Sequence, residues 1–239
     1  MPWRRRPSER SPACKRRASV VILPRSFYER PTLHVAADLI GKVLLHETRS
    51  GIASGVIVEA EAYIGENDPA CHAAPGPTAR NAPLYGPPGV AYVYLNYGIH
   101  YLVNAVTEAE GRPAAILIRA LEPKDGLPLM RRRRAAGSRA RPSQLLLHDL
   151  CRGPGNLTKA LGITLRQNCL DLTRGPLRVE DQAGAARPLV WTRRIGITVG
   201  VEQEWRVLAS DSSAVSGGRG GSRGRGTTIS RSSTARVRE

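Results

Sequence analysis

Residues 43–63 read VLLHETRSGIASGVIVEAEAY, and this stretch does most to decide the fold. The apolar run Val43–Glu47 predicts a strand, Gly51–Gly55 predicts a turn, and Gly55–Ala60 predicts a second strand. Strands joined by so short a connection pair with each other in antiparallel fashion, so we expect a β-hairpin here. The hairpin should bring the acidic residues that follow it to the end of a strand.

The acidic end of this stretch is the first candidate site. Successive side chains of a strand point to opposite faces, so Glu59, Glu61 and Tyr63 should share one face. Two carboxylates and a tyrosine on one face could form a site for acid–base chemistry. The same pattern is compatible with an ordinary solvated strand face, and the sequence leaves both interpretations open.

Strands dominate the middle of the chain, which favours a single α+β domain. Apolar periodicity and the placing of Gly and Pro predict further elements on both sides of the hairpin. We expect a helix from Pro31 to Gly41, strands at 91–95, 102–107, 114–121, 177–180 and 193–199, helices at 126–136 and 157–161, and a loop at 65–88.

Positive charge is concentrated at the two ends of the chain. The formal net charge is +16, the pI is about 10.8, and the first 30 residues carry nine Lys/Arg against two acids. We expect a disordered basic arm over residues 1–22, the folded domain over 23–208, and a disordered Gly/Ser/Arg-rich tail over 209–239. This charge favours nucleic acid as a partner, although a basic surface can also serve solubility alone.

Aromatic residues gather in one region of the chain. Six of the seven tyrosines lie between Tyr63 and Tyr101, a stretch that also contains His72. Flat π-faces beside carboxylates in a basic protein suggest stacking on bases, attraction to phosphates and a carboxylate for chemistry. His72 on its own, in a loop rich in Gly and Pro, is also compatible with a plain surface histidine.

The densest part of this region, residues 92–101, reads YVYLNYGIHY. Alternation places Tyr92 and Tyr94 on the same side of a strand. Gly98 permits a tight bend, which leaves Tyr97 near its tip, where a tyrosine could wedge between stacked bases. Ordinary packing of tyrosines in a sheet explains the pattern equally well.

Two further features could bind charge. Arg119 lies inside an apolar run and needs a partner if it is buried, for which Glu61 is a plausible candidate; otherwise it reaches solvent at a strand end. The sequence Gly153-Pro154-Gly155 opens an expected helix and could bind a phosphate through free backbone N–H groups, although such a turn alone is weak evidence.

Several classes of protein find no support in the sequence. The four cysteines are widely spaced without a CxxC pair, which indicates free thiols in a reducing cytoplasm rather than a zinc site. No apolar run approaches the roughly 20 residues of a membrane span. We therefore expect no metal, no cofactor and no membrane partner.

Several of these segments together resemble the 3-methyladenine (alkyladenine) DNA glycosylase family of vertebrates and many bacteria. The resemblance extends from about Leu23 to Arg206 and depends on several long words in the right order. They are ADLIGKVL (37–44), IVEAEAYIG (57–65), DPACH (68–72), GPPGVAYVYLNYG (86–98), LIRALEP (117–123) and RGPG (152–155).

The resemblance implies a monofunctional enzyme that flips alkylated or deaminated purines out of duplex DNA and hydrolyses the N-glycosidic bond, leaving an abasic site. It implies that Glu61 activates the attacking water and that Arg119 and the backbone carbonyl of Ile195 position this water. No cofactor is implied. The partner would be double-stranded DNA containing damaged purines, bound by a monomer in the cytoplasm, at the nucleoid in a bacterium.

The resemblance also implies how the damaged base is held. Tyr63, His72 and Tyr94 match the walls of the base pocket, and Asn104 matches a residue that discriminates against the guanine amino group. Tyr97 matches the side chain that fills the vacated stack. The implied fold has a curved, mostly antiparallel sheet with flanking helices, and a protruding hairpin that intercalates into DNA.

The chain departs from the family pattern at two places. After Trp205-Arg206 the family continues with an aromatic strand, whereas this chain reads Val207-Leu208-Ala209-Ser210 and then turns to Gly, Ser and Arg. We therefore expect that a closing strand is missing, which would leave a lesion-binding protein with impaired catalysis as the alternative function. Asn156 stands where the family commonly has lysine.

Overall fold

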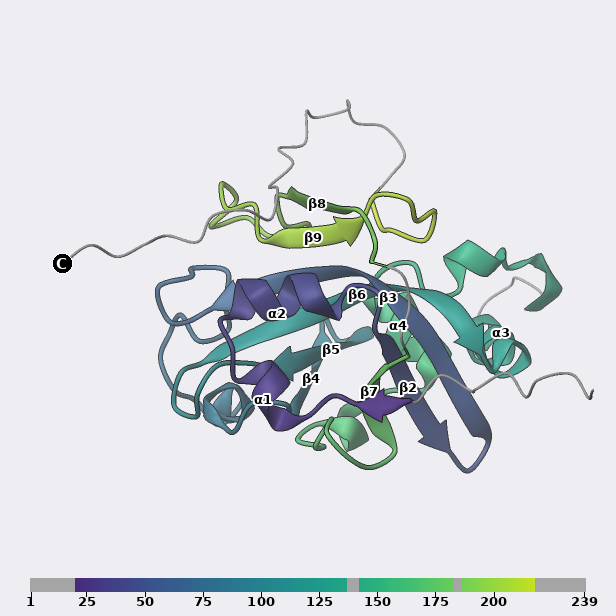
Figure 1. The fold of residues 1–239 in the computed structure, drawn as a ribbon, viewed down its shortest axis with the longest axis horizontal. Helices are drawn as coiled ribbons and strands as arrows, with labels where there is room; N and C mark the ends of the chain where they lie inside the picture. The colour runs from purple at the N-terminus through teal and green to yellow at the C-terminus, as the bar shows by residue number, and fades with distance from the viewer. Residues whose placement is uncertain (1–19, 137–141, 183–185, 218–239) are drawn as a thin grey trace, which may run out of the picture.

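The computed structural model describes residues 20–136, 142–182 and 186–217, which form an α+β fold around one sheet (Figure 1). Within these residues the sheet has nine strands, in the order β1-β7-β2-β3-β6-β5-β4, with β9 on β3 and β8 on β9. The strands are β1 (Val21–Ile22), β2 (Val43–Thr48), β3 (Gly51–Ile64), β4 (Ala91–Asn96), β5 (His100–Val106), β6 (Ala114–Asp125), β7 (Leu177–Asp181), β8 (Leu189–Thr192) and β9 (Arg206–Ala209). Their pairings are antiparallel, which confirms the expected fold class.

Strands β3 and β6 form the long centre of the sheet. β2 pairs with the first part of β3, from Gly51 to Val56, and β9 takes over the same edge from Glu59 to Glu61. Between β3 and β6 the register shifts on either side of Glu59, which marks a bulge in the ladder. Bulges re-aim side chains, and this one lies where the acidic residues stand.

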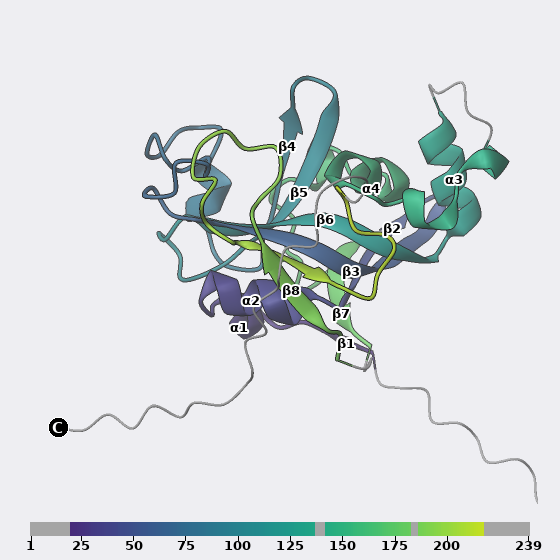
Figure 2. The ribbon, with the colours of Figure 1, turned by 90° about the horizontal axis from the view of Figure 1, so that it is seen from above.

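Helices cover both faces of the sheet, as Figure 2 shows. The helices α1 (Arg25–Tyr28) and α2 (Thr32–Leu39) lie on one face, and α4 (Pro154–Leu161) lies on the other beside α3 (Leu127–Ala135). Short 3-10 helices occur at Ala82–Tyr85, Pro142–Gln144, Leu147–Asp149 and Leu165–Gln167. None of the helices in the described part of the chain is long and apolar enough to cross a bilayer.

One hydrophobic core joins these layers. From α2, Val35, Ala36 and Leu39 are fully buried, at the helical spacing that the sequence showed. They join the buried side chains of the central strands, among them Ile57 and Ile118. Because side chains pack on both faces of the sheet, the position of its central strands is fixed. The candidate site is built on these strands.

Two local expectations were wrong. The first hairpin turns at residues 49 and 50, and the chain is already extended at Gly51. Residues 193–199 are not a strand, because Gly196 has a positive φ of 78° and the N–H of Ile195 bonds a side chain instead of a neighbouring strand. The strand lies just before them, at β8.

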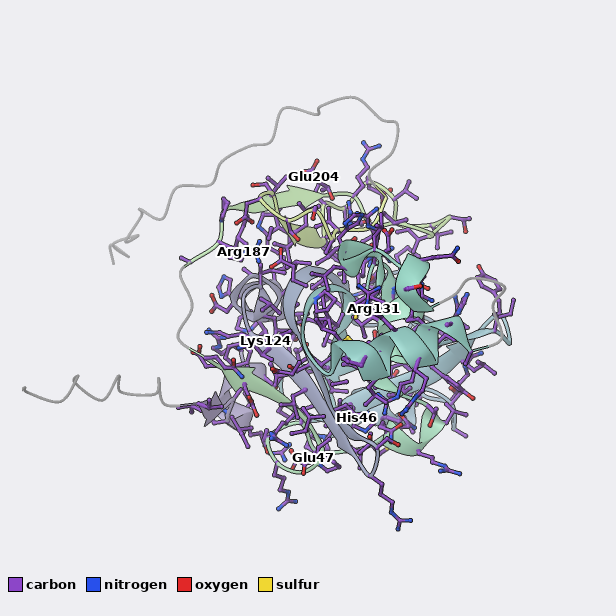
Figure 3. All side chains as sticks on the ribbon, turned by 90° about the vertical axis from the view of Figure 1, so that its right-hand side faces the viewer. His46, Glu47, Lys124, Arg131, Arg187 and Glu204 are labelled. Atoms are coloured by element: carbon purple, nitrogen blue, oxygen red, sulfur yellow. The ribbon has the colours of Figure 1, made fainter. Side chains whose placement is uncertain are left out.

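The C-terminal end also differs from expectation. The strand that we expected to be missing is present as β9, and the chain remains packed beyond it, with Ser212 and Ala214 buried. Arg187, labelled in Figure 3, joins this segment to β6 through ion pairs with Glu122 at 2.7 Å and Asp211 at 2.9 Å. Small apolar residues and ion pairs replace the aromatic residues of the family pattern.

The described residues extend past both ends of the range 23–208, and the expected domain boundaries stay a prediction. Val21–Ile22 already pairs with β7, and the described structure continues past 208 to residue 217. The expected arm and tail otherwise fall on residues 1–19 and 218–239, which lie outside the described residues.

Candidate active site

Two buried carboxylates form the centre of the candidate site. Glu59 and Glu61 lie on β3 between β6 and β9, and both are fully buried, so a solvated strand face is excluded. A buried carboxylate is stable as an anion only when charges and hydrogen bonds compensate for the lost water. The partners of the two carboxylates are different.

Glu61 accepts hydrogen bonds from three groups. The N–H of Ile195 donates to Oε1 at 2.7 Å, the Tyr63 hydroxyl donates to Oε2 at 3.0 Å, and Arg119 Nη1 donates to Oε2 at 3.0 Å. An ionised carboxylate has about four acceptor sites, so a position on Oε1 remains for a further donor such as water. These three donors hold the carboxylate in one orientation.

Glu59 is surrounded by a separate set of donors. Arg119 Nε and Arg206 Nε both donate to its Oε1, at 3.1 and 2.7 Å. The hydroxyl of Ser216 donates to Oε1 at 2.7 Å and the N–H of Ser216 to Oε2 at 2.5 Å. Arg119 therefore lies between the two carboxylates and bonds both.

Aromatic side chains stand beside Glu61. The rings of His72 and Tyr94 lie 4.5 Å apart, and those of Tyr92 and Tyr94 lie 5.3 Å apart. His72 Nδ1 and the Tyr92 hydroxyl are within hydrogen-bond distance at 2.9 Å. Burial, reinforced by the guanidinium of Arg80, lowers the pKa of His72 below its ordinary 6.5, so the ring is neutral at pH 7.

The aromatic hydroxyls are also kept protonated. Burial raises the pKa of Tyr63 well above its ordinary value, and the charge of Glu61 adds to this effect. Burial raises the pKa of Tyr92 to about 12. Tyr63 can therefore act as a donor to Glu61 at any physiological pH.

These groups line a cavity of about 510 Å³ that opens between the aromatic region and α4. It brings together seven of the eight residues singled out in the sequence, and the eighth, Glu61, lies directly behind three of them. The seven are Tyr63, His72, Tyr94, Tyr97, Asn104, Arg119 and Ile195. A cavity with apolar walls and a few fixed polar groups is typical of a small-ligand site.

Asn104 occupies the floor of the cavity on β5. It is nearly fully buried, and its Nδ2 donates to the carbonyl of Tyr92 at 3.0 Å, across the β4–β5 pair. This bond fixes the plane of the amide. Asn104 lies among the residues that line the cavity, and its role in discriminating among purines stays a prediction.

The support beneath Tyr63 was not predicted from the sequence. Arg194 lies 4.7 Å from the centre of the Tyr63 ring and forms a fully buried ion pair with Asp68, at 2.6 and 2.8 Å. Its guanidinium also stacks against Trp205 at 5.1 Å. This cluster holds the chain that carries Ile195 against the loop that carries His72.

The hairpin of β4 and β5 rises beside the cavity, on the side of the sheet that carries α4 (Figure 2). At its tip Tyr97 and Gly98 both have positive φ, 49° and 70°, as a type I′ turn requires. Such a φ is uncommon for a tyrosine. Tyr97 is 87% exposed and Ile99 is 73% exposed, so the tip presents two large apolar side chains to solvent.

The start of α4 forms the rim of the cavity opposite Tyr63. Gly153 and Gly155 line it, and a side chain at Gly155 would collide with His100, to whose ring an added Cβ would come within 2.7 Å. Asn156, which replaces the family's lysine, donates from Nδ2 to the carbonyl of Arg152 at 2.7 Å. Its side chain therefore caps local backbone.

Ile195 contributes a contact that the resemblance did not imply. The resemblance implies that its backbone carbonyl positions the water, and the structure shows in addition that its N–H donates to Glu61. The sequence also missed Arg206 and Ser216, which bond Glu59 from the C-terminal end of the chain. An apolar strand followed by Ser and Gly carries no local signal for such a contact.

Known proteins resemble this chain over most of its length. Residues 26–213 match the family described as Methylpurine-DNA glycosylase (MPG). A protein of Methanocella arvoryzae is 46% identical over 82% of this chain and 96% of its own, and one of Rubrobacter xylanophilus is 50% identical over 72% and 85%. One of Bradyrhizobium diazoefficiens is 49% identical over 77% and 85%.

All three carry the name "Putative 3-methyladenine DNA glycosylase". Both the identity and the shared length are high, and five of the six words that carry the resemblance contribute residues that line the cavity. The chain belongs to the methylpurine-DNA glycosylase family.

Proposed function

We propose that this protein is a monofunctional DNA glycosylase, which removes alkylated or deaminated purines from duplex DNA by hydrolysis and leaves an abasic site. One observation carries the proposal: a fully buried carboxylate, held by three donors, lies behind an aromatic-walled cavity of about 510 Å³. Family membership supports the same reaction class.

The chemistry assigned to Glu61 is that of a general base. A water at Oε1 attacks the sugar C1′, its oxygen forms the new C–O bond, and its proton passes to the carboxylate. The C1′–N bond breaks and its electron pair leaves with the purine. The negative charge of Glu61 also stabilises the positive charge that develops on the sugar.

The aromatic walls would select the base. Tyr63, His72 and Tyr94 offer stacking faces, and alkylated purines often carry positive charge, which π-faces attract. Because the pKa of His72 is lowered, its ring adds no positive charge that would repel such a base. Asn104, with its amide fixed by the Tyr92 carbonyl, would discriminate among purines at the cavity floor.

The exposed hairpin tip would open the duplex. Tyr97 would enter the stack in place of the flipped nucleotide, because wedges of this kind are apolar, exposed and held on a stiff element. Flipping costs a few kcal/mol and is easiest for damaged bases, so part of the selectivity comes before the cavity. The net charge of +16 would favour duplex DNA as the partner.

The alternative of a binding protein without catalysis was based on a missing closing strand. Since β9 is present and Arg206 on it bonds Glu59, that reason no longer applies. Among the residues that the structure describes, those that line the cavity include no lysine, which supports hydrolysis by water over a lyase reaction through an amine.

The test is base release from duplexes that hold a single hypoxanthine, 1,N6-ethenoadenine or 3-methyladenine. Alkali is added after the reaction to cut any abasic site. We expect strand cleavage only after alkali. No release from any of the three duplexes by folded protein would refute the proposal, and cleavage without alkali would refute its monofunctional part.

A further inference from the structure

The guanidinium of Arg119 links the two buried carboxylates. It donates through Nη1 to Glu61 at 3.0 Å, through Nε to Glu59 at 3.1 Å and through Nη2 to the hydroxyl of Ser216 at 3.3 Å. Glu61 lies directly behind Tyr63, Arg119 and Ile195, which line the cavity and donate to it, whereas neither Glu59 nor Ser216 is among the lining residues. The groups on the far side of Arg119 therefore cannot touch a base, but they determine where Arg119 stands.

The buried charges around Arg119 balance one another. Glu59 and Glu61 bring two negative charges into the sheet, and Arg119 and Arg206 bring two positive charges. A buried charge without a partner is strongly unfavourable, so the four groups form one compensated unit. Ser216 completes it, since its N–H and hydroxyl donate to Glu59 and its carbonyl accepts from Arg206 Nη2 at 2.8 Å.

The segment that carries Ser216 also reaches the other support of Glu61. Gly217 lies so close to Ile195 that a Cβ added to it would come within 2.9 Å of Ile195 Cδ1. The N–H of Ile195 is the donor to Glu61 Oε1. Ser216 therefore contacts Arg119, and Gly217 contacts Ile195. Both contacted residues are donors to Glu61.

The segment is fixed where it lies. Ala214 is almost fully buried, Arg152 donates to the carbonyl of Ser213, and Asp211 pairs with Arg187. Its contacts with Glu59 span 157 positions of sequence. A hydroxyl on such a segment can hold a guanidinium in place, because its own position is set by packing.

We infer that Glu59 and Ser216 are positioning residues for the reaction, with Ser216 holding Arg119, and through it Glu61, in the orientation that activates water. The inference rests on the proposed glycosylase activity. It adds that the C-terminal segment, which departs most from the family pattern, is part of the catalytic support. A small displacement of a catalytic group lowers the rate of the reaction rather than the affinity for the substrate.

The test compares Ser216→Ala with Ser216→Thr in the full chain. Ala removes the hydroxyl, whereas Thr keeps it and the backbone N–H. The matched control is Ser210→Ala, in the same segment, where the exposed hydroxyl meets only the carbonyl of Pro188 at 3.5 Å. Each variant is assayed for the single-turnover rate of base release, for the Kd of a lesion duplex, and for Tm.

We expect Ser216→Ala to slow base release about 10- to 100-fold, as the loss of hydrogen bonds to charged groups suggests, with the Kd unchanged. Ser216→Thr should recover most of the rate, and Ser210→Ala should match the unaltered protein. A wild-type rate for Ser216→Ala, or a loss confined to Kd or Tm, would overturn the inference. If the unaltered protein releases no base, the proposed function fails instead, so the two failures are distinguishable.

A double-mutant cycle gives the second test. If Ser216 acts through Arg119, the losses caused by Ser216→Ala and Arg119→Gln will not multiply, because the hydroxyl has nothing to hold once the guanidinium is gone. The double variant should then be no slower than Arg119→Gln alone. Fully multiplicative losses would show that Ser216 does not work through Arg119.

Discussion

The centre of the sheet and the tip of the β4–β5 hairpin are built on opposite principles. At the centre Glu61 is fully buried and held by three donors, whereas at the tip Tyr97 is 87% exposed and held in an unusual backbone conformation. The centre can fix a reacting group because packing surrounds it. The tip can enter another molecule because nothing covers it.

This difference teaches that changes in the two regions should alter different quantities. Substitutions at the centre should change the rate of reaction or the free energy of unfolding. Substitutions at the tip should change DNA affinity and leave the fold as it is. Four predictions test this division, from the largest expected effect to the smallest.

Glu61→Gln should give the largest effect. The amide cannot take a proton from water, so we expect single-turnover base release to fall by about 10³-fold or more. The Kd for a lesion duplex should stay close to that of the unaltered protein. The measurement is release followed by alkaline cleavage, with fluorescence anisotropy for binding, and equal release by the variant would remove Glu61 from its assigned role.

Asp68→Ala should most strongly affect the stability of the centre. It leaves the guanidinium of Arg194 buried without its ion-pair partner, where both side chains are fully buried. We expect the free energy of unfolding to fall by about 3–5 kcal/mol in denaturant titrations. The control is Asp38→Ala, whose partner Arg30 is 39% exposed and whose loss should cost at most about 1 kcal/mol.

Equal losses for Asp68→Ala and Asp38→Ala would mean that the Asp68–Arg194 cluster does not support the fold.

Tyr97→Ala should act on binding alone. Stacking of an aromatic side chain on bases contributes about 1–3 kcal/mol, so we expect the Kd for a lesion duplex to rise about 5- to 150-fold. The Tm should hardly change, because the side chain is exposed. Tyr97→Phe keeps the ring and serves as the control; a drop in Tm at unchanged Kd would make the tip a structural element.

The smallest effect concerns pH. His46 on β2 is buried, its Nδ1 lies 2.9 Å from the carbonyl of Leu161, and burial lowers its pKa below 6.5 in spite of that contact. The unfolded chain therefore binds the proton more readily than the folded one, so stability is complete above pH 6.5 and falls as the pH drops below it.

His46→Gln should reduce the fall in free energy of unfolding between pH 7.5 and 5.5, measured by urea titration at each pH. Variants of the tip should show the same pH dependence as the unaltered protein. An unchanged slope in His46→Gln would assign the acid sensitivity to other groups, among them His72, whose pKa is lowered as well.

The sequence predicted the parts of the fold that local patterns encode. Alternation and turn residues located β2, β4 and β6, and helical spacing located α2, because burial on one face leaves a periodic trace. Residues 193–199 were misread as a strand, since their apolar side chains serve the cavity and a turn instead. A local sequence pattern cannot show whether an apolar side chain packs in a strand or lines a cavity.

The candidate site was predictable only in part, and mainly through the resemblance. The sequence suggested Glu61 and Arg119 as partners, and the structure joins them at 3.0 Å. It could not suggest Arg206, 147 positions from Glu59, because a long-range ion pair leaves no mark near either residue. The register between β3 and β6 also shifts on either side of Glu59, a bulge that no local sequence pattern predicted.

The contact of Ser216 with Glu59 has a consequence for how the protein is made. A ribosome synthesises residue 59 well before residue 216, so for most of translation Glu59 and Arg119 exist without the donors that later enclose them. Contacts of such sequence separation carry a large loop-closure cost and form late in folding. The central strands can pair early, but the charge of Glu59 is fully compensated only after Ser216 has left the ribosome. Catalytic competence is therefore expected to appear as a late step, after this residue has emerged.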